Sequence, residues 1–122
     1  MEEFRVIVAG GHRYKNYDQV KLSLDKVLKN KQGHRITIIT GDLPGTEHFA
    51  IRYSKERELN YRVFACKKQK YKRNAVYVRN SEMLSEGLPH AILAFWNGEN
   101  GIVEDILKKA KHKELNIRLF RY

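Results

Sequence analysis

Short apolar runs that lead directly into glycine-containing turns recur along this chain. Val6 to Ala9 are four consecutive apolar residues, too few for a helix and rich in β-branched side chains, so they predict a strand buried on both faces. Gly10 and Gly11 follow at once, and Asn16 then has the side chain to cap a helix. Strand, turn and helix therefore follow one another within the first 30 residues.

The later segments repeat this order. Further strands are predicted at residues 36–40, 61–66, 91–96 and 117–120, and helices at about 16–31, 47–59, 74–85 and 102–110. Gln19 is expected to complete a capping box with Asn16. Five strands alternating with helices through short turns predict an α/β sandwich of three layers, with a mainly parallel five-stranded sheet covered by helices on both faces.

Length and composition predict a single small domain. The 122 residues are enough for one core, so we expect one domain over residues 1–122. No apolar run approaches the roughly 18 residues of a membrane span, so no membrane partner is expected. Met1-Glu2-Glu3 leads straight into a strand, which does not resemble a signal or transit peptide, and the lone Cys66 cannot form an internal disulfide. Both features favour a cytoplasmic location.

The charge is strongly positive. A formal net charge of +10 favours an anionic partner, which can be a nucleotide, a nucleic acid or an acidic surface. The densest basic run is Lys67 to Arg73, which is equally compatible with a solvated loop and with a binding element. Tyr71 within this run has a ring that can stack on a base.

The unusual loops all follow predicted strands. They are Gly10–Arg13, Gly41–Glu47, Lys67–Arg73 and Asn97–Gly101. Because parallel strands end at the same edge of a sheet, these loops should meet at one edge, where α/β proteins bind their ligands. On the opposite, helix-to-strand side, only Lys31–His34 and Ser85–His90 are comparable candidates. The sequence therefore predicts a binding site at the carboxyl edge of the sheet.

Four short motifs in order resemble a known superfamily. They are Gly11-His12-Arg13, Gly41-Asp-Leu-Pro-Gly45-Thr-Glu47, Arg79-Asn80-Ser-Glu-Met83 and Phe95-Trp96-Asn97-Gly98. In this order the chain resembles the SLOG superfamily, the Rossmann-like group that includes the LOG enzymes and DprA, and most of all its small, single-domain YspA-like members. The resemblance implies a Rossmann-like fold and a nucleotide or nucleotide-derived ligand lying across the glycine turns.

This resemblance assigns roles to individual residues. Backbone N–H groups of Gly11, Gly45 and Gly101 would hold phosphate oxygens at helix N-termini. Arg13 and Arg79 would contact phosphate or ribose. The expected ligand-binding residues are Gly10, Gly11, His12, Arg13, Gly41, Asp42, Gly45, Thr46, Glu47, Arg79, Asn80, Asn97, Gly98 and Gly101. No two histidines have the spacing of metal ligands, so neither a metal nor another cofactor is expected.

Three functions remain open from the sequence. The first is binding without catalysis, as a sensor or a protein that sequesters a nucleotide signal. The second is a LOG-like phosphoribohydrolase that cleaves the N-glycosidic bond of a nucleoside monophosphate, with Arg79 and either Glu104 or Asp105 as the matching catalytic residues. Gly98-Glu-Asn-Gly101-Ile102, however, lacks the Thr and one Gly of the LOG motif. The third is single-stranded nucleic-acid binding through Lys67–Arg73.

Assembly is also expected, because SLOG relatives often form oligomers. The apolar and aromatic side chains nearest the predicted strand ends are the candidates for an interface between copies. They are Phe95, Trp96 and those of the Phe120–Tyr122 segment.

Overall fold

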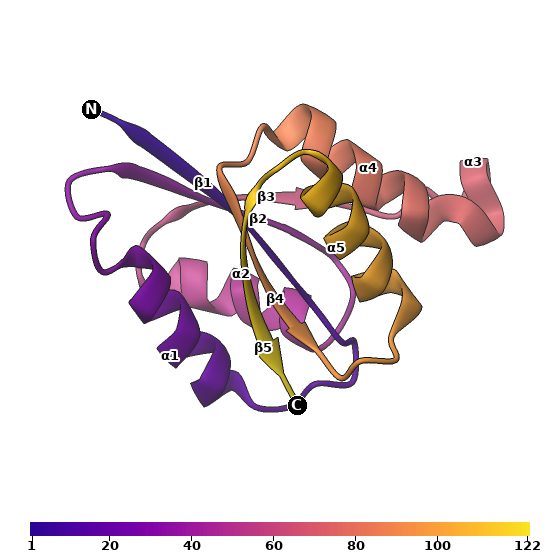
Figure 1. Ribbon diagram of the computed structural model, residues 1–122, viewed down its shortest axis with the longest axis horizontal. Helices are drawn as coiled ribbons and strands as arrows, with labels where there is room; N and C mark the ends of the chain where they lie inside the picture. The colour runs from indigo at the N-terminus through magenta and orange to yellow at the C-terminus, as the bar shows by residue number, and fades with distance from the viewer.

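The computed structural model describes residues 1–122 and shows a Rossmann-like α/β sandwich of three layers (Figure 1). The strands are β1 (Glu3–Gly10), β2 (Arg35–Gly41), β3 (Asn60–Phe64), β4 (Ala91–Trp96) and β5 (Asn116–Arg121). The helices are α1 (Tyr17–Leu28), α2 (Thr46–Glu56), α3 (Lys68–Tyr71), the short 3-10 helix η1 (Lys72–Asn74), α4 (Ala75–Gly87) and α5 (Gly101–His112).

All five strands are parallel, in the order β3-β2-β1-β4-β5. The chain builds outward from β1 to β3, then returns to place β4 on the other side of β1. At the centre of the sheet, Val6 therefore pairs with Ile38 of β2 and with Ala91 of β4. The predicted mainly parallel five-stranded sheet is confirmed, and the winding direction reverses between β1 and β4.

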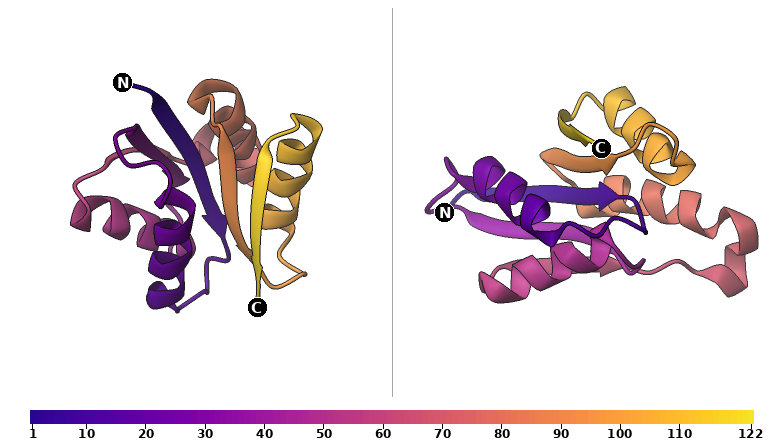
Figure 2. Two further views of the ribbon diagram at one scale, coloured as in Figure 1. Left: turned by 60° about the vertical axis from the view of Figure 1, so that its left-hand side comes forward. Right: turned by 90° about the horizontal axis from the view of Figure 1, so that it is seen from below.

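Each face of the sheet carries its own apolar core. On one face, Val6, Val8 and Ile38 pack beneath α1 and α2, which contribute Leu24 and Tyr53. On the other face, alternate residues of the same strands pack beneath α4 and α5; this core is formed by Ile7, Ala9, Ile39, Phe64, Met83, Leu84, Ile92, Ile106 and Ala110. Figure 2 shows the two helix pairs on opposite sides of the sheet. Burial on both faces explains why the central strands are continuous apolar runs rather than alternating ones.

The start of α1 follows the prediction only in part. The Asn16 side chain accepts a hydrogen bond from the Gln19 backbone N–H at 3.0 Å, as expected for an N-cap. The Gln19 side chain does not return to Asn16 but donates to the Ser23 hydroxyl at 2.9 Å. The predicted capping box is therefore wrong, because an i to i+4 partner on the helix surface is available to Gln19.

Two predicted boundaries also differ. The helix expected to continue to about Leu59 ends at Glu56, because Glu58 adopts a left-handed φ of 55°. The strand expected over 61–66 ends at Phe64. The basic run that follows forms α3 and η1, which stand away from the sheet (Figures 1 and 2). No helix combines the length and apolar composition that crossing a membrane requires.

The expected interface residue Phe95 is fully buried, with 0% of its surface exposed. Its ring stacks on Tyr14 at 5.5 Å between centroids and packs against Phe120 at 5.7 Å. Trp96 is half-buried, and its indole N–H donates to the Asn100 carbonyl at 3.0 Å. The expectation that Phe95 contacts another copy is therefore wrong, because β4 is an inner strand of the sheet and helices cover both of its faces.

Candidate functional site

A hollow of about 280 Å³ opens at the carboxyl edge, where the winding direction of the sheet reverses. Gly11, His12 and Arg13 line it from the turn after β1. The turn after β4 and the residue following β5 supply the other wall, formed by Asn97, Glu99, Asn100 and Tyr122. Ligands of open α/β sheets bind at this reversal point. The hollow is therefore the candidate site at the predicted edge.

The turn after β1 is fixed by its own hydrogen bonds. The Gly11 carbonyl accepts from the Tyr14 N–H at 3.2 Å, the Thr46 N–H at 3.3 Å and the Thr46 hydroxyl at 3.1 Å. The Gly11 N–H donates to the Phe95 carbonyl at 3.2 Å. The expectation that this N–H holds a phosphate oxygen is therefore wrong, because the donor extends the β1–β4 pairing.

The glycine turns after β1 and β2 pack directly against each other. Gly45 adopts a left-handed φ of 76°, and a side chain there would collide with the Gly11 and His12 carbonyls. A side chain at Gly10 would collide with Thr46. Both positions therefore require glycine, because the two turns pack too closely to leave room for a side chain. The space for a ligand lies on the other side of the β1 turn, towards β4. No side chain caps α2, whose positive N-terminal end lies next to His12.

Arg79 and Glu47 form a buried bidentate ion pair. Arg79 Nη1 lies 2.9 Å from Glu47 Oε1, Nη2 lies 3.0 Å from Oε2, and the side chains are 1% and 4% exposed. Gly41 makes room for this pair, since a side chain there would overlap both groups. The Leu43 N–H also donates to Glu47 Oε1, at 3.0 Å. Burial raises the pKa of Glu47, while the Arg79 guanidinium and the Leu43 N–H oppose that rise.

This pair changes the role expected for both residues. Arg79 Nε donates to the side-chain oxygen Oδ1 of Asn80 at 3.3 Å, so each nitrogen of the guanidinium has a protein partner. Arg13, in contrast, is exposed and makes no ion pair. Arg79 does not line the hollow that Arg13 lines. The structure thus brings Arg79 to Glu47 and leaves Arg13 facing the hollow.

The candidate catalytic acids lie on α5 in ion pairs with lysines. Glu104 Oε1 is 3.1 Å from Lys108 Nζ, and Asp105 Oδ2 is 2.8 Å from Lys109 Nζ. The Asn80 amide donates to the Asp105 carboxylate and to the Ile102 carbonyl, both at 3.1 Å, and so ties α4 to α5. None of these acids lines the hollow.

The turn after β4 is held by two asparagines. The Asn97 side-chain oxygen accepts from the Glu99 N–H at 2.8 Å and the Asn100 N–H at 2.9 Å. Asn100 then caps α5 by accepting from the N–H groups of residues 102 and 103. Gly98 has a left-handed φ of 87° and Gly101 faces open space. Asp42 is exposed after β2.

Three lining residues were not among the predicted ones: Glu99, Asn100 and Tyr122. Tyr122 follows β5, so the reasoning from strand ends that selected the other loops would also have selected it. Its ring contacts Tyr14 at 4.5 Å between centroids, and burial raises the pKa of its hydroxyl. An aromatic surface therefore borders the hollow.

Comparison with known proteins identifies the family of this chain. A family model described as the YspA, cpYpsA-related SLOG family matches residues 4–71, which run from β1 through α3 and cover more than half of the chain. A search of curated proteins found no match. The chain thus belongs to the YspA, cpYpsA-related SLOG family.

Proposed function

We propose that this protein binds a nucleotide or nucleotide-derived ligand at the carboxyl edge of its sheet, as a sensor or a sequestering protein. The observation that carries this proposal is the position of the 280 Å³ hollow at the reversal point between β1 and β4. Its volume lies near the lower end of small-molecule sites, which span about 300–1,000 Å³. One nucleotide moiety is therefore a better match than a dinucleotide.

The lining residues supply the chemistry that such a ligand needs. Arg13 is an exposed guanidinium without a carboxylate partner, suited to bidentate contact with a phosphate. Tyr122 offers a ring for stacking, and Glu99 offers a carboxylate for ribose hydroxyls.

Binding is favoured over hydrolysis by the placement of the candidate catalytic groups. A hydrolase needs its acid or base within hydrogen-bond reach of the reacting bond. Arg79 is bonded to Glu47, and both candidate acids are paired with lysines away from the hollow. We therefore expect no free base to be released when nucleoside monophosphates are incubated with the protein, as chromatography of the mixture would show.

The test is a thermal-shift screen with AMP, ADP-ribose, NAD and cyclic nucleotides, followed by calorimetry of the best ligand. Arg13→Ala should weaken binding at least about tenfold, because a charge-assisted bidentate contact contributes about 1.5–3 kcal/mol. Lys15 lies two residues after Arg13, and its side chain does not line the hollow. Lys15→Ala removes the same charge and should bind like the wild type. The proposal fails if no nucleotide stabilises the protein, or if both variants bind equally.

A second candidate function rests on the basic run. Lys67–Arg73 forms α3 and η1, which have no buried residue and stand away from the body of the protein (Figure 2). Lys67 is paired with Glu82 at 2.9 Å, while Lys68, Lys70 and Arg73 have no carboxylate partner. Such an exposed cationic projection suits the phosphates of single-stranded nucleic acid.

Fluorescence anisotropy with a labelled single-stranded oligonucleotide tests this second function. Affinity should fall steeply as salt rises, and Lys68→Ala/Lys70→Ala should reduce it far more than Arg13→Ala does. Absence of binding at low salt would eliminate this function without affecting the nucleotide proposal.

A further inference from the structure

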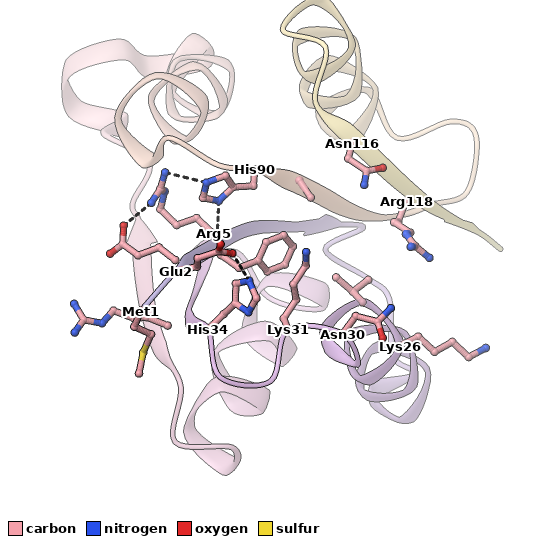
Figure 3. Close-up of a pocket in the computed structure, with 15 residues that line it drawn as sticks. Met1, Glu2, Arg5, Lys26, Asn30, Lys31, His34, His90, Asn116 and Arg118 are labelled. Carbon is pink, nitrogen blue, oxygen red and sulfur yellow. Dashed lines mark hydrogen bonds and ion pairs between the residues drawn. The ribbon is translucent and has the colours of Figure 1, made fainter.

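A much larger groove lies at the opposite, amino edge of the sheet. Its volume is about 1010 Å³, against about 280 Å³ for the hollow at the carboxyl edge. The end of α1 and the loop into β2 form one wall and β5 forms another (Figure 3). Phe4 and Ala91 also line the groove. It includes His34 and His90, from the two helix-to-strand loops that the sequence singled out on this side.

Both acidic groups of the groove already have side-chain partners. Glu3 lies 2.8 Å from Arg5 Nη1, and Glu2 lies 2.9 Å from His34 Nε2. The backbone N–H of Arg5 donates to His90 Nδ1 at 2.9 Å, which fixes both residues beside the groove floor. Figure 3 shows these contacts gathered on one side of the groove. The acids therefore leave the charge of the remaining cations uncompensated.

Four cations of the groove make no ion pair: Lys26, Lys31, Arg35 and Arg118. Lys26 and Lys31 belong to the end of α1 and the loop after it and Arg35 begins β2, whereas Arg118 lies on β5. Lys31 Nζ is held 4.7 Å above the ring of Phe4. The negative C-terminal end of α1 accounts for the lysines, but it does not account for an arginine on the edge strand opposite.

Two amide side chains complete the set. Asn30 and Asn116 line the groove beside Lys31 and Arg118, respectively (Figure 3). Neither amide has a side-chain hydrogen bond within the protein. Each provides an N–H₂ donor, so cationic and neutral donors face the groove from both walls.

We propose that this groove is a second anion site, for a ligand that carries two linked phosphoryl groups. Lysine ammonium and arginine guanidinium groups form charge-assisted hydrogen bonds to phosphoryl oxygens, and the neutral amide N–H₂ groups add weaker ones. The four unpaired cations can offset the charge of a diphosphate, and the groove is large enough for a diphosphate with an organic group attached. The site is separated from the carboxyl-edge hollow by the length of the sheet, so the two can be occupied independently.

The experiment is an NMR titration of the ¹⁵N-labelled protein with inorganic pyrophosphate at low ionic strength, repeated with ADP. Amide shifts with pyrophosphate should cluster at residues 26–35, 90–91 and 116–118. Lys31→Ala/Arg118→Ala should weaken pyrophosphate binding at least about tenfold, because it removes two charge-assisted contacts. Lys70→Ala/Lys111→Ala removes the same charge outside the groove and should leave the affinity within about twofold.

The outcomes separate this site from the proposed function. If ADP shifts the amino edge as strongly as pyrophosphate does, the diphosphate is recognised as part of a nucleotide; if only pyrophosphate does, the free ion is recognised. Shifts spread over all basic surfaces, or equal weakening in both double variants, would overturn the proposal. Nucleotide shifts confined to residues 11–13 and 97–100, with no pyrophosphate shifts at the amino edge, would overturn it while supporting the carboxyl-edge site.

Discussion

The two edges of the sheet use their charged residues differently. At the carboxyl edge, Arg79 and Glu47 are almost completely buried and bonded to each other, and only the small hollow beside Arg13 remains open. At the amino edge, the groove is more than three times as large and holds cations without partners. Glu47 and Arg79 therefore serve the fold, whereas the unpaired cations of the groove have no evident structural purpose.

The contrast shows that a residue which stands out in the sequence can stabilise the fold instead of binding a ligand. Two motifs, Gly41-x-x-x-Gly45-x-Glu47 and Arg79-Asn80, hold α2, β2, α4 and α5 together. They do so through the Arg79–Glu47 ion pair and the hydrogen bonds of the Asn80 amide to α5. These contacts fix the positions of the turns around the hollow. In this account, Arg79 and Glu47 position the site without touching the ligand.

The largest effect is expected when the buried pair is broken. Glu47→Ala leaves the Arg79 guanidinium buried without a counter-charge, which should lower the free energy of unfolding by about 3–5 kcal/mol in urea titrations. Glu104→Ala is the matched control, since it removes one carboxylate from the exposed pair with Lys108 and should cost under about 0.5 kcal/mol. Similar losses in the two variants would show that the Glu47–Arg79 pair stabilises the fold no more than an exposed ion pair does.

The next effect concerns the space that Gly41 leaves for the same pair. Gly41→Ala would push a methyl group into Arg79 and Glu47, and we expect a loss of about 1–3 kcal/mol by overpacking. Gly101→Ala meets nothing within 4 Å and should leave stability unchanged or slightly higher. Thermal melts of both variants provide the comparison, and a neutral Gly41→Ala would contradict the packing described here.

A smaller, pH-dependent effect is expected towards the amino edge, where α1 and α2 meet. The Tyr53 hydroxyl donates to Asp25 at 2.6 Å, and burial together with this bond raises the pKa of Tyr53 from 10.0 to about 12. Between pH 10 and 12 the unfolded chain therefore loses the Tyr53 proton first, so this group lowers stability as pH rises through that window.

Tyr53→Phe isolates this contribution. At pH 8 it should cost about 1 kcal/mol through the lost hydrogen bond. Above pH 10 the difference from the wild type should shrink, because each pH unit of the pKa difference corresponds to about 1.4 kcal/mol. Urea midpoints at pH 8, 10 and 11 would reveal this, and a constant difference across the three pH values would refute it.

The smallest effect on stability is expected at Arg13. Its side chain is exposed and makes no ion pair, so Arg13→Ala should change the free energy of unfolding by less than about 0.5 kcal/mol. Circular dichroism during urea unfolding would measure this, and a larger loss would place Arg13 in the structural class of Arg79 rather than in the ligand site.

The fold was predictable because its signals are local. Short apolar runs and glycine turns marked β1, β2 and β4 directly, and the helical spacing of apolar residues marked α1, α4 and α5. The exceptions were decided by neighbours along the surface, as when Gln19 bonded to Ser23 instead of completing a capping box. The helical form of α3 within a run of lysines also lacked an apolar periodicity that could predict it.

The candidate site was predictable in location but not in detail. Strand ends indicated the carboxyl edge, and Gly11, His12, Arg13 and Asn97 do line the hollow. The pairing of Arg79 with Glu47 joins residues 32 positions apart and depends on how α4 packs on β2, which no local pattern encodes. For the same reason, the convergence of Lys31 and Arg118 at the opposite edge emerged only from the structure.

The most direct test of the proposed function is an NMR titration with ADP-ribose and AMP that maps amide shifts over the whole chain. We expect saturable shifts at residues 11–13, 97–100 and 122, together with their loss in Arg13→Ala but not in Lys15→Ala. Saturable binding that leaves these residues unshifted would contradict a nucleotide site at the carboxyl edge.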